Sequence, residues 1–364
     1  MDRQSGCIGY SILCQFGPAQ FLAWGYEIVL LKPQTLSSKH IASGVMSHKP
    51  DVEIRAPRDD DWVVDGVPLP RPGDDTWQRT RVAIADGQVV GSASLMLAPV
   101  TDWYFCEVTV VPEYRRRSLG TRLYAAVYEL TDRSIPVVTR AMNSQPIRRR
   151  FVESIGCSTL VHCPEPWIDP TSTAGQEWIT QQQLPDGYQT VSMDELPIER
   201  VERAWSTYFE WAHRPFGTVH TDQLPQYWTQ YSDGLDPDAS RLSIETSTGA
   251  IVVLSLVAPD AWDGRTMIVS ETVHEEQRHG DQLLGATIAA SLGRLADQGI
   301  RRVELEGHST DAHSPQIVQT IPAGGGDPMD ILKLAPPHRG SAHEAARPAA
   351  QRGHAPSAER SEAP

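Results

Sequence analysis

The chain has 364 residues, of which 40% are apolar and 21% charged, and its formal net charge is −14. This length predicts about two domains, and the composition is that of a globular protein. The acidic balance argues against a nucleic-acid-binding surface and against an anionic-membrane surface, because both need a basic field. It favours a cationic partner, such as an amine.

The two ends of the chain differ from its middle. We expect residues 1–45 to be an extension outside the fold, because the first domain-like segment follows Met46. The apolar stretch 7–31 carries too many polar residues for a membrane span or a signal peptide. Residues 336–364 have almost no large apolar side chain, so we predict a disordered tail there.

Cysteines and histidines indicate no metal site and no disulfide framework. The five cysteines are an odd number, and no pair has the spacing of a zinc site. Reduced thiols in a cytoplasmic, bacterial protein are the expected state. His274 and His279 lack partners at metal-ligand spacing, so no metal is predicted.

Residues 46–168 form the first predicted domain, in which strand and helix patterns alternate. Asp86-Gly87 separates two apolar runs, as in a β-hairpin. Apolar residues then recur at the helical period after Leu119. In chain order we predict a hairpin over 79–100, a strand at 103–111, a helix at 121–130, a strand at 136–140, a helix at 146–155 and a strand at 157–163.

The same order of elements returns in residues 186–335 after a polar connector at 169–185. Superposing residues 108–130 on 271–293 aligns Arg115 with Arg278, which indicates an internal repeat of about 160 residues. We therefore expect an α+β, mixed α/β protein of two similar domains. Three tryptophans of the second domain are expected in its core rather than in a substrate cage: Trp205, Trp211 and Trp228.

The most informative stretch is Val108–Thr121, VTVVPEYRRRSLGT, in which a β-branched strand, a proline and three arginines lead into a helix. The first N–H groups of a helix have no intrahelical partner, and the helix dipole adds positive potential there. Such a turn is a ready anion site, and the arginines indicate a phosphate-bearing ligand.

At these residues the sequence resembles the GNAT superfamily of acetyl-CoA-dependent N-acetyltransferases. That family has Arg/Gln-x-x-Gly-x-Gly/Ala after a strand of the type V-x-V-x-P. Here Arg115 and Gly120 match, and Ser118 replaces the first glycine, which we expect to be tolerated if its backbone stays in the helical region. A second family element, an Asn that opens the next helix, fits Asn143, with Gly156 at the end of that helix.

The resemblance implies two mixed sheets that splay after their fourth strand, with acetyl-CoA as cosubstrate in the first. Its pantetheine arm would pair with the backbone near Val108 and Val110, and Asn143 would contact it from the other side. Its diphosphate would lie on the backbone N–H groups of Arg115, Arg116, Arg117, Ser118, Leu119, Gly120 and Thr121.

The second repeat is expected to be degenerate as a cofactor site. Its turn has Asp281, a negative charge where phosphate should lie, and Leu283 in place of Gly120. The segment 306–313 has no Asn in the family's place. We expect this domain to support the fold or to shape the acceptor site.

Acetyl transfer needs a base for the amine, stabilisation of an oxyanion and a proton for the leaving thiolate. The resemblance implies Glu107 as the base, with Asp102 in reserve, and the Val110 N–H as the oxyanion donor. The usual tyrosine is missing from the helix after Asn143. Tyr104 and Tyr124 are possible substitutes, although core packing is the better interpretation of both.

The resulting hypothesis is an acetyl-CoA-dependent N-acetyltransferase that acts on a primary amine, of a small molecule, by direct attack in a ternary complex. The alternatives are an acyl-CoA-binding sensor without turnover and a structural protein with two inactive sites. We expect no nucleic-acid or membrane partner, and a monomer or a homodimer.

Overall fold

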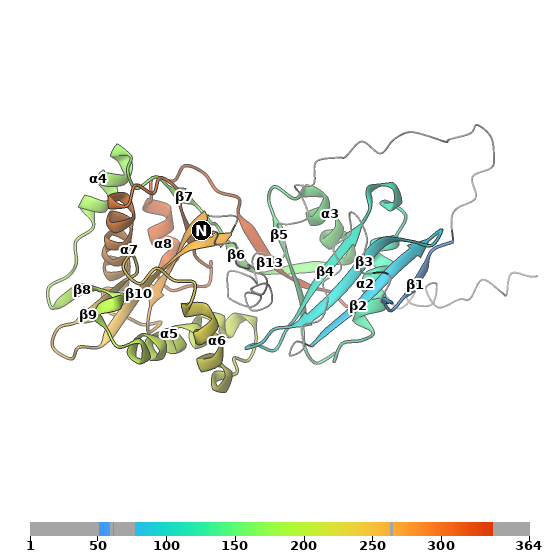
Figure 1. The fold of residues 1–364 in the computed structure, drawn as a ribbon, viewed down its shortest axis with the longest axis horizontal. Coiled ribbons are helices and arrows are strands. Elements are labelled where there is room, and N and C mark those ends of the chain that lie inside the picture. Colours follow the sequence, from blue (N-terminus) through green and yellow to red (C-terminus); the bar gives the residue numbers. More distant parts are fainter. Residues whose placement is uncertain (1–50, 59–60, 62–76, 263–264, 338–364) are drawn as a thin grey trace, which may run out of the picture.

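The computed structural model describes residues 51–58, 61, 77–262 and 265–337. The predicted N-terminal extension and most of the predicted disordered tail lie outside these described residues. Two mixed sheets, each flanked by helices, make up the molecule (Figure 1). The mixed α/β fold predicted from the sequence is therefore confirmed.

The first sheet has seven strands in the order β1-β2-β3-β4-β5-β13-β6. All neighbours are antiparallel except β4 and β5, which are parallel. The strands are β1 (Glu53–Arg55), β2 (Gln78–Ala85), β3 (Gln88–Leu97), β4 (Tyr104–Val110), β5 (Val137–Met142), β6 (Cys157–Cys163) and β13 (Met329–Leu334).

The second sheet has six strands in the order β7-β12-β11-β10-β9-β8. Its one parallel pair is β11 with β12, which matches the place of the β4–β5 pair in the first sheet. The strands are β7 (Trp167–Ile168), β8 (Tyr188–Ser192), β9 (Arg241–Glu245), β10 (Ile251–Trp262), β11 (Arg265–Thr272) and β12 (Val303–Glu306).

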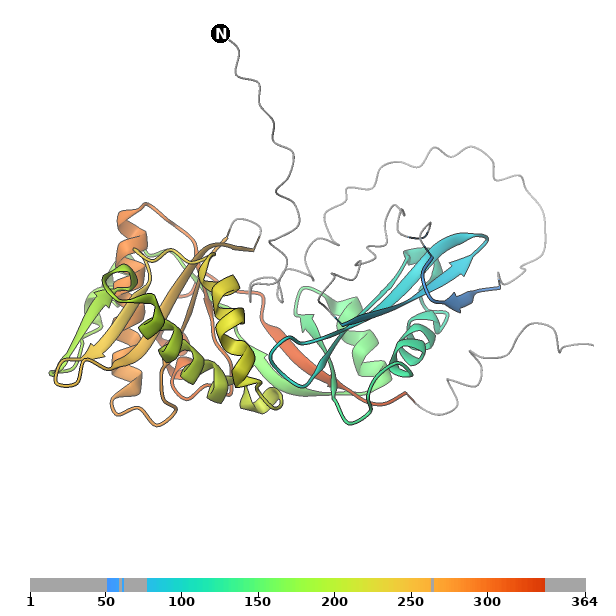
Figure 2. The same cartoon turned by 60° about the horizontal axis from the view of Figure 1, so that its bottom comes forward.

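One strand crosses back from the end of the chain. Strand β13 follows the whole second sheet in sequence but pairs with β5 and β6 in the first sheet. Strand β7, at the end of the predicted first domain, pairs with β12 and is the first strand of the second sheet. Figures 1 and 2 show β6 and β13 running side by side between the two halves. The first sheet is therefore built from two separate segments, whereas the second sheet comes from the continuous residues 167–306. The domain boundary expected at 168 leaves β7 apart from its own sheet, and the second-domain range 186–335 includes β13 of the first.

The helices bury apolar faces against the sheets. In the first domain α2 and α3 cover one face of the first sheet, where Leu123, Tyr124 and Val152 are buried. In the second domain α7 is buried along most of its length. The helices are α2 (Leu119–Tyr128), α3 (Pro146–Ile155), α4 (Thr173–Gln181), α5 (Ile198–His213), α6 (Leu224–Ser232), α7 (Gly280–Asp297) and α8 (Ser314–Thr320).

Aromatic side chains form the core beneath α5 and α6. Trp205 stacks on Tyr231 with ring centroids 5.6 Å apart, and it contacts Trp228 at 5.1 Å. The Trp211 indole N–H donates to the Val273 carbonyl at 3.0 Å. The prediction that these tryptophans belong to the core is confirmed.

Local patterns predicted most of the elements. The hairpin at Asp86-Gly87 is confirmed, with both residues at positive φ, and α3 has the predicted bounds. The predicted connector 169–185 instead contains α4, where the Ser172 hydroxyl accepts the Gly175 N–H at 3.0 Å and Trp178 is buried. Strands β7 and β13 and helix α6 were not predicted, because short apolar runs carry no information on their partners.

The loop between β3 and β4 joins the two domains at a second place. Thr101 forms a bridge with Val219, and Asp102 Oδ1 lies 2.8 Å from His220 Nε2. The Trp103 and Phe216 rings lie 5.3 Å apart. Among the helices of the described residues, none combines the length and apolar character that crossing a bilayer requires.

Expressing residues 46–168 alone should not yield a stable domain. Without β13 the apolar side chains of Met329, Ile331, Leu332 and Leu334 are missing from its core. At about 1.5–3 kcal/mol each, they account for much of the 5–15 kcal/mol by which a domain is typically stable. We expect no cooperative thermal transition by circular dichroism.

The matched control appends residues 327–337 to this segment through a Gly/Ser linker. It should restore a cooperative transition, because β13 can then fill the space between β5 and β6. Cooperative unfolding of the segment without β13 would show that this strand is dispensable.

Candidate functional site

The strands β4 and β5 diverge after two paired residues. Tyr104 pairs with Val137 and Phe105 with Val138, and no further β4–β5 pairs follow along the described strands. Strand β4 continues to pair with β3 on its other side as far as Val110. We call the region where β4, from Cys106 to Val110, has left β5 the first splay.

Backbone groups of β4 point into the first splay. The Val111 N–H donates to the Val90 carbonyl of β3, so by the alternation of a strand Val108 and Val110 face the opposite side, towards β5. The Thr139 hydroxyl spans the start of the splay and donates to the Cys106 carbonyl at 2.8 Å. The Val108 and Val110 N–H groups have no strand partner among the described residues, which leaves them free to bind an extended ligand.

The turn that follows the splay places helix α2 next to it. The Arg115 N–H donates to Pro112, and the Arg122 N–H to Ser118. The N–H groups of Leu119, Gly120 and Thr121 start the helix and have no backbone acceptor among the described residues. Three donors and the positive end of a ten-residue helix therefore lie beside the splay.

The three arginines of the turn are exposed, and each lies differently. The Arg115 side chain folds back, and its Nε donates to the Val110 carbonyl at 2.8 Å. The Arg117 guanidinium lies over the Tyr114 ring at 5.4 Å. Arg116 has a positive φ of 61°. Arg115 thus braces the turn from within, whereas the other two guanidinium groups remain near the surface.

Ser118 does not keep right-handed helical backbone angles, so the condition under which it was expected to replace glycine without cost is not met. Its φ is 59° and its ψ is 10°, which is the left-handed region that glycine favours. Gly120 has a different reason to be glycine. A Cβ there would lie 2.9 Å from the Phe151 ring, so the residue lets α2 approach α3 closely.

Glu107 lies in the first splay but is engaged by an arginine. Arg148 of α3 reaches between β4 and β5, and its Nη1 and Nη2 contact the two Glu107 carboxylate oxygens, each at 2.6 Å. The guanidinium also donates to Thr139 Oγ1 at 2.9 Å and to the Arg140 carbonyl at 2.5 Å. Burial lowers the pKa of Arg148, but the Glu107 carboxylate more than offsets this and raises it above its ordinary value.

Arg148 was not singled out in the sequence. Three arginines in succession at the start of α3 were the available signal, but periodicity cannot tell which of them turns inward. The ion pair means that the Glu107 carboxylate can accept a proton from an amine only after it separates from Arg148 or through an intervening water.

The other candidate catalytic side chains have structural partners. Asp102 lies at the domain junction, paired with His220. The Tyr104 hydroxyl accepts the Asp132 N–H at 3.2 Å, and the Tyr124 hydroxyl donates to the Ala335 carbonyl at 2.8 Å. Burial raises the pKa of Tyr124. Both tyrosines are buried, which agrees with the core-packing interpretation.

Asn143 does not open helix α3, contrary to expectation. The helix begins at Pro146, and Gln145 is its N-cap residue without a side-chain bond. The Asn143 N–H donates to the Pro328 carbonyl, and its Oδ1 accepts from Arg149 at 3.2 Å. Asn143 thus lies against the segment that enters β13.

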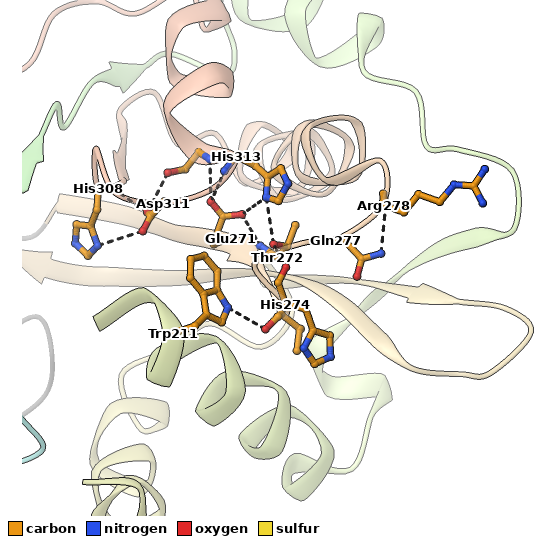
Figure 3. Close-up of polar contacts among 11 residues, drawn as sticks. Trp211, Glu271, Thr272, His274, Gln277, Arg278, His308, Asp311 and His313 are labelled. Carbon is orange, nitrogen blue, oxygen red and sulfur yellow. Dashed lines mark hydrogen bonds and ion pairs between the residues drawn. The ribbon is translucent and has the colours of Figure 1, made fainter. Parts of the chain in front are cut away.

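The second sheet has a similar splay, but side chains of the protein occupy it. Strands β11 and β12 pair from Thr266–Val303 to Val269–Glu306 and then diverge. Glu271, fully buried in this second splay, accepts the N–H groups of Thr272 at 2.7 Å, His313 at 3.1 Å and Ser314 at 2.8 Å (Figure 3). The protein's own carboxylate therefore occupies backbone donors of the second splay.

His313 closes the second splay further. Its Nδ1 lies 3.0 Å from the Glu271 carboxylate, and this hydrogen bond raises the His313 pKa. A Cβ on Gly280, the first residue of α7, would lie 2.1 Å from His313 Nε2. The imidazole thus packs against the helix start whose counterpart in the first domain is open.

The helix starts correct the alignment of the two repeats. α2 begins at Leu119 after the left-handed Ser118, and α7 begins at Gly280 after the left-handed His279. Gly120 therefore corresponds to Asp281, not to Leu283, a shift of two residues. One residue of the shift arises because β11 ends at Thr272 rather than Val273, and the other because the connection to the helix is one residue shorter. The carboxylate of Asp281 still lies in the first turn of α7, as the degenerate repeat requires.

Comparisons with known proteins agree with this architecture. Residues 51–155 match the family model described as acetyltransferase (GNAT) family. This segment contains the first splay, the turn and α3. It is a GNAT domain. No curated protein matches the sequence.

Solved structures of GNAT proteins share the fold. A GCN5-related N-acetyltransferase from Sphaerobacter thermophilus is 19% identical, with a TM-score of 0.54 over 71% of this chain and 81% of that one. A tandem GNAT protein from the clavulanic acid biosynthesis pathway is 17% identical, with a TM-score of 0.52 over 72% and 84%. A glucosamine N-acetyltransferase region of a fungal multi-domain β-N-acetylglucosaminidase is 12% identical, with a TM-score of 0.51 over 78% and 38%.

Replacing Ser118 by Gly should stabilise the protein. The left-handed backbone destabilises the folded state of a non-glycine residue by on the order of 1–3 kcal/mol. Glycine removes this strain, but its greater backbone entropy in the unfolded state costs about 0.5–1 kcal/mol. We expect a net increase of roughly 0.5–1 kcal/mol in the free energy of unfolding, measured by urea denaturation. Ser118→Val, which is β-branched, should lower it, and equal stability of the two variants would contradict the strain.

Proposed function

We propose that this chain is an acetyl-CoA-dependent N-acetyltransferase with one working cofactor site, in its first GNAT domain. The observation that carries the proposal is the contrast between the two splays. Among the described residues, the first has free backbone donors at Val108 and Val110 next to an open helix start. The second has the same strand geometry, but Glu271 and His313 take up its donors and its space.

The residues of the first splay fit the parts of the cosubstrate. The backbone of Val108 would pair with the amides of the pantetheine arm as a neighbouring strand would. The N–H groups of Leu119, Gly120 and Thr121 would receive the diphosphate, with Arg116 and Arg117 near enough to screen its charge. When bound, acetyl-CoA supplies the acyl group and a thiolate leaving group.

The Val110 N–H would then stabilise the oxyanion that develops when the amine attacks, because it faces the splay without a strand partner. Arg148 lies further back along β4, at Glu107, where it holds the carboxylate that would act as the base. Glu107 would take the amine proton after release from Arg148 or through a water. The acceptor we propose is a primary amine of a small molecule, for which the net charge of −14 is the support.

A sensor that binds acyl-CoA without turnover is the second candidate. The observation that favours it is the pairing of Glu107 with Arg148, together with the structural hydrogen bonds of Tyr104 and Tyr124. Calorimetry with acetyl-CoA, combined with thiol release on a panel of amines, separates the two candidates. Binding without thiol release on any amine would favour the sensor.

Ser118→Asp tests the cofactor site without disturbing packing. Ser118 is exposed, and a carboxylate at a helix N-terminus favours the helix, so the variant should fold. The new charge would repel the diphosphate and weaken acetyl-CoA binding by about tenfold or more, which is about 1.4 kcal/mol. Ser118→Asn, of the same shape but uncharged, is the control, and equal affinities in calorimetry would refute the assignment.

Glu107→Gln tests the base. If the carboxylate removes the amine proton, kcat should fall by about 10²–10⁴-fold, while the Kd for acetyl-CoA stays unchanged because the cofactor contacts are backbone groups. Steady-state kinetics and calorimetry give the two values. A variant that retains the wild-type kcat would assign Glu107 to holding Arg148 in place.

A further inference from the structure

The two segments that cross between the domains enclose a cavity. The Trp167 backbone N–H donates to the Gly325 carbonyl at 2.9 Å, and the Trp167 carbonyl accepts the Gly324 N–H at 2.8 Å. The segment that leads from β6 to β7 therefore lies beside the segment that leads back to β13. A cavity of about 260 Å³ opens beside them. Its walls are Glu165, Trp167, Arg265, Arg302, Glu304, Gly324, Gly325, Gly326 and Asp327.

The glycines shape the wall of this cavity. A Cβ on Gly324 would lie 2.2 Å from the Trp167 ring, and one on Gly326 would lie 2.4 Å from the Glu165 carbonyl oxygen. Side chains at these positions would push the two crossing segments apart.

Glu165 is in a state that a purely structural residue rarely has. It is 4% exposed, and its Oε1 has no hydrogen-bond partner among the described residues. It forms no ion pair with a described residue, and its φ is 42°, an uncommon conformation for a large side chain. Strained backbone and unsatisfied buried polar groups occur preferentially at binding and catalytic sites.

The other charged groups of the cavity already have partners. Arg265 and Arg302 both pair with Glu304, at 2.8 Å and 2.9 Å. Asp327 accepts hydrogen bonds from the Ser144 N–H and hydroxyl. Because the two arginines are engaged by Glu304, the group that the cavity lacks is a donor for Glu165.

The surroundings of Glu165 favour a positive donor. Burial, helped by the carboxylates of Glu306 and Glu304 on β12, raises the pKa of Glu165 to about 8 against the opposing charges of Arg140 on β5 and Arg265 on β11. The Cys163 thiol of β6 also faces it, and burial raises that pKa to about 12, so it carries no charge at neutral pH. A cation beside Glu165 would relieve the repulsion among the carboxylates and take the place of the proton.

We propose that this cavity binds a small organic cation with a primary ammonium group, and that Glu165 is its ion-pair partner. The walls come from the crossing segments, β7, β11 and β12, and none from β4, β5 or α2. The site is therefore separate from the first splay, and the inference does not depend on acetyl transfer. The occupant would bridge the two segments that connect the domains.

Calorimetric titration of the full chain with putrescine, without acetyl-CoA, tests the proposal. At pH 7 a group with a pKa of about 8 is about 90% protonated, so binding should release about 0.9 proton per site, seen as different heats in phosphate and HEPES buffers. Affinity should rise about tenfold from pH 6 to pH 7 and level off above pH 8. n-Butanol, similar in size but uncharged, should not bind.

Glu165→Gln should abolish putrescine binding and its pH dependence, and it should fold, because it removes a buried acid. Glu275→Gln, an exposed carboxyl at the other end of β11, is the matched control and should bind as the wild type does. The absence of heat with wild-type protein at millimolar putrescine overturns the proposal. Putrescine binding that survives Glu165→Gln also overturns it. So does binding to the wild-type protein without proton release, a measurement that does not depend on whether the variant folds.

Discussion

Strand β13 lies between β5 and β6, and the geometry of the first splay depends on it. On one side β5 is held by only two residue pairs with β4, and on the other by five pairs with β13. Since β4 is fixed by β3, the position of β5 relative to β4 is set largely by a strand that follows the second domain in sequence. A strand that follows the second domain in sequence thus helps to shape the proposed cofactor site.

The two splays show how side chains decide what one backbone arrangement can do. Each combines a diverging parallel pair, a left-handed residue and a helix start. In the first, Gly120 faces the Phe151 ring and the helix donors stay open. In the second, Glu271 satisfies the donors of α8, and His313 packs on Gly280. A buried carboxylate that already accepts three backbone N–H groups leaves little reason for an anionic ligand to enter.

The sequence pattern predicted the elements that depend on neighbouring residues, but not the strand pairings and side-chain contacts between distant segments. Strand–turn–helix patterns around Val108–Thr121 and the hairpin at Asp86-Gly87 are encoded within a few residues. The return of β13 to the first sheet is not, because the run Met329–Leu334 would suit any buried strand. The same limit applies to Arg148, whose contact with Glu107 joins residues from α3 and β4. The repeat alignment was shifted by two residues at the helix, because the second strand ends one residue earlier and its turn is one residue shorter.

The late position of β13 in the chain also sets an order of events during synthesis. The ribosome synthesises β1 to β6 well before β13. The edges of β5 and β6 that pair with β13 therefore stay unpaired until the second domain has been synthesised. Exposed strand edges invite pairing with other chains. The half of the protein that is translated first is therefore completed last, and a stalled or truncated chain would leave behind an adhesive edge rather than a smaller working enzyme.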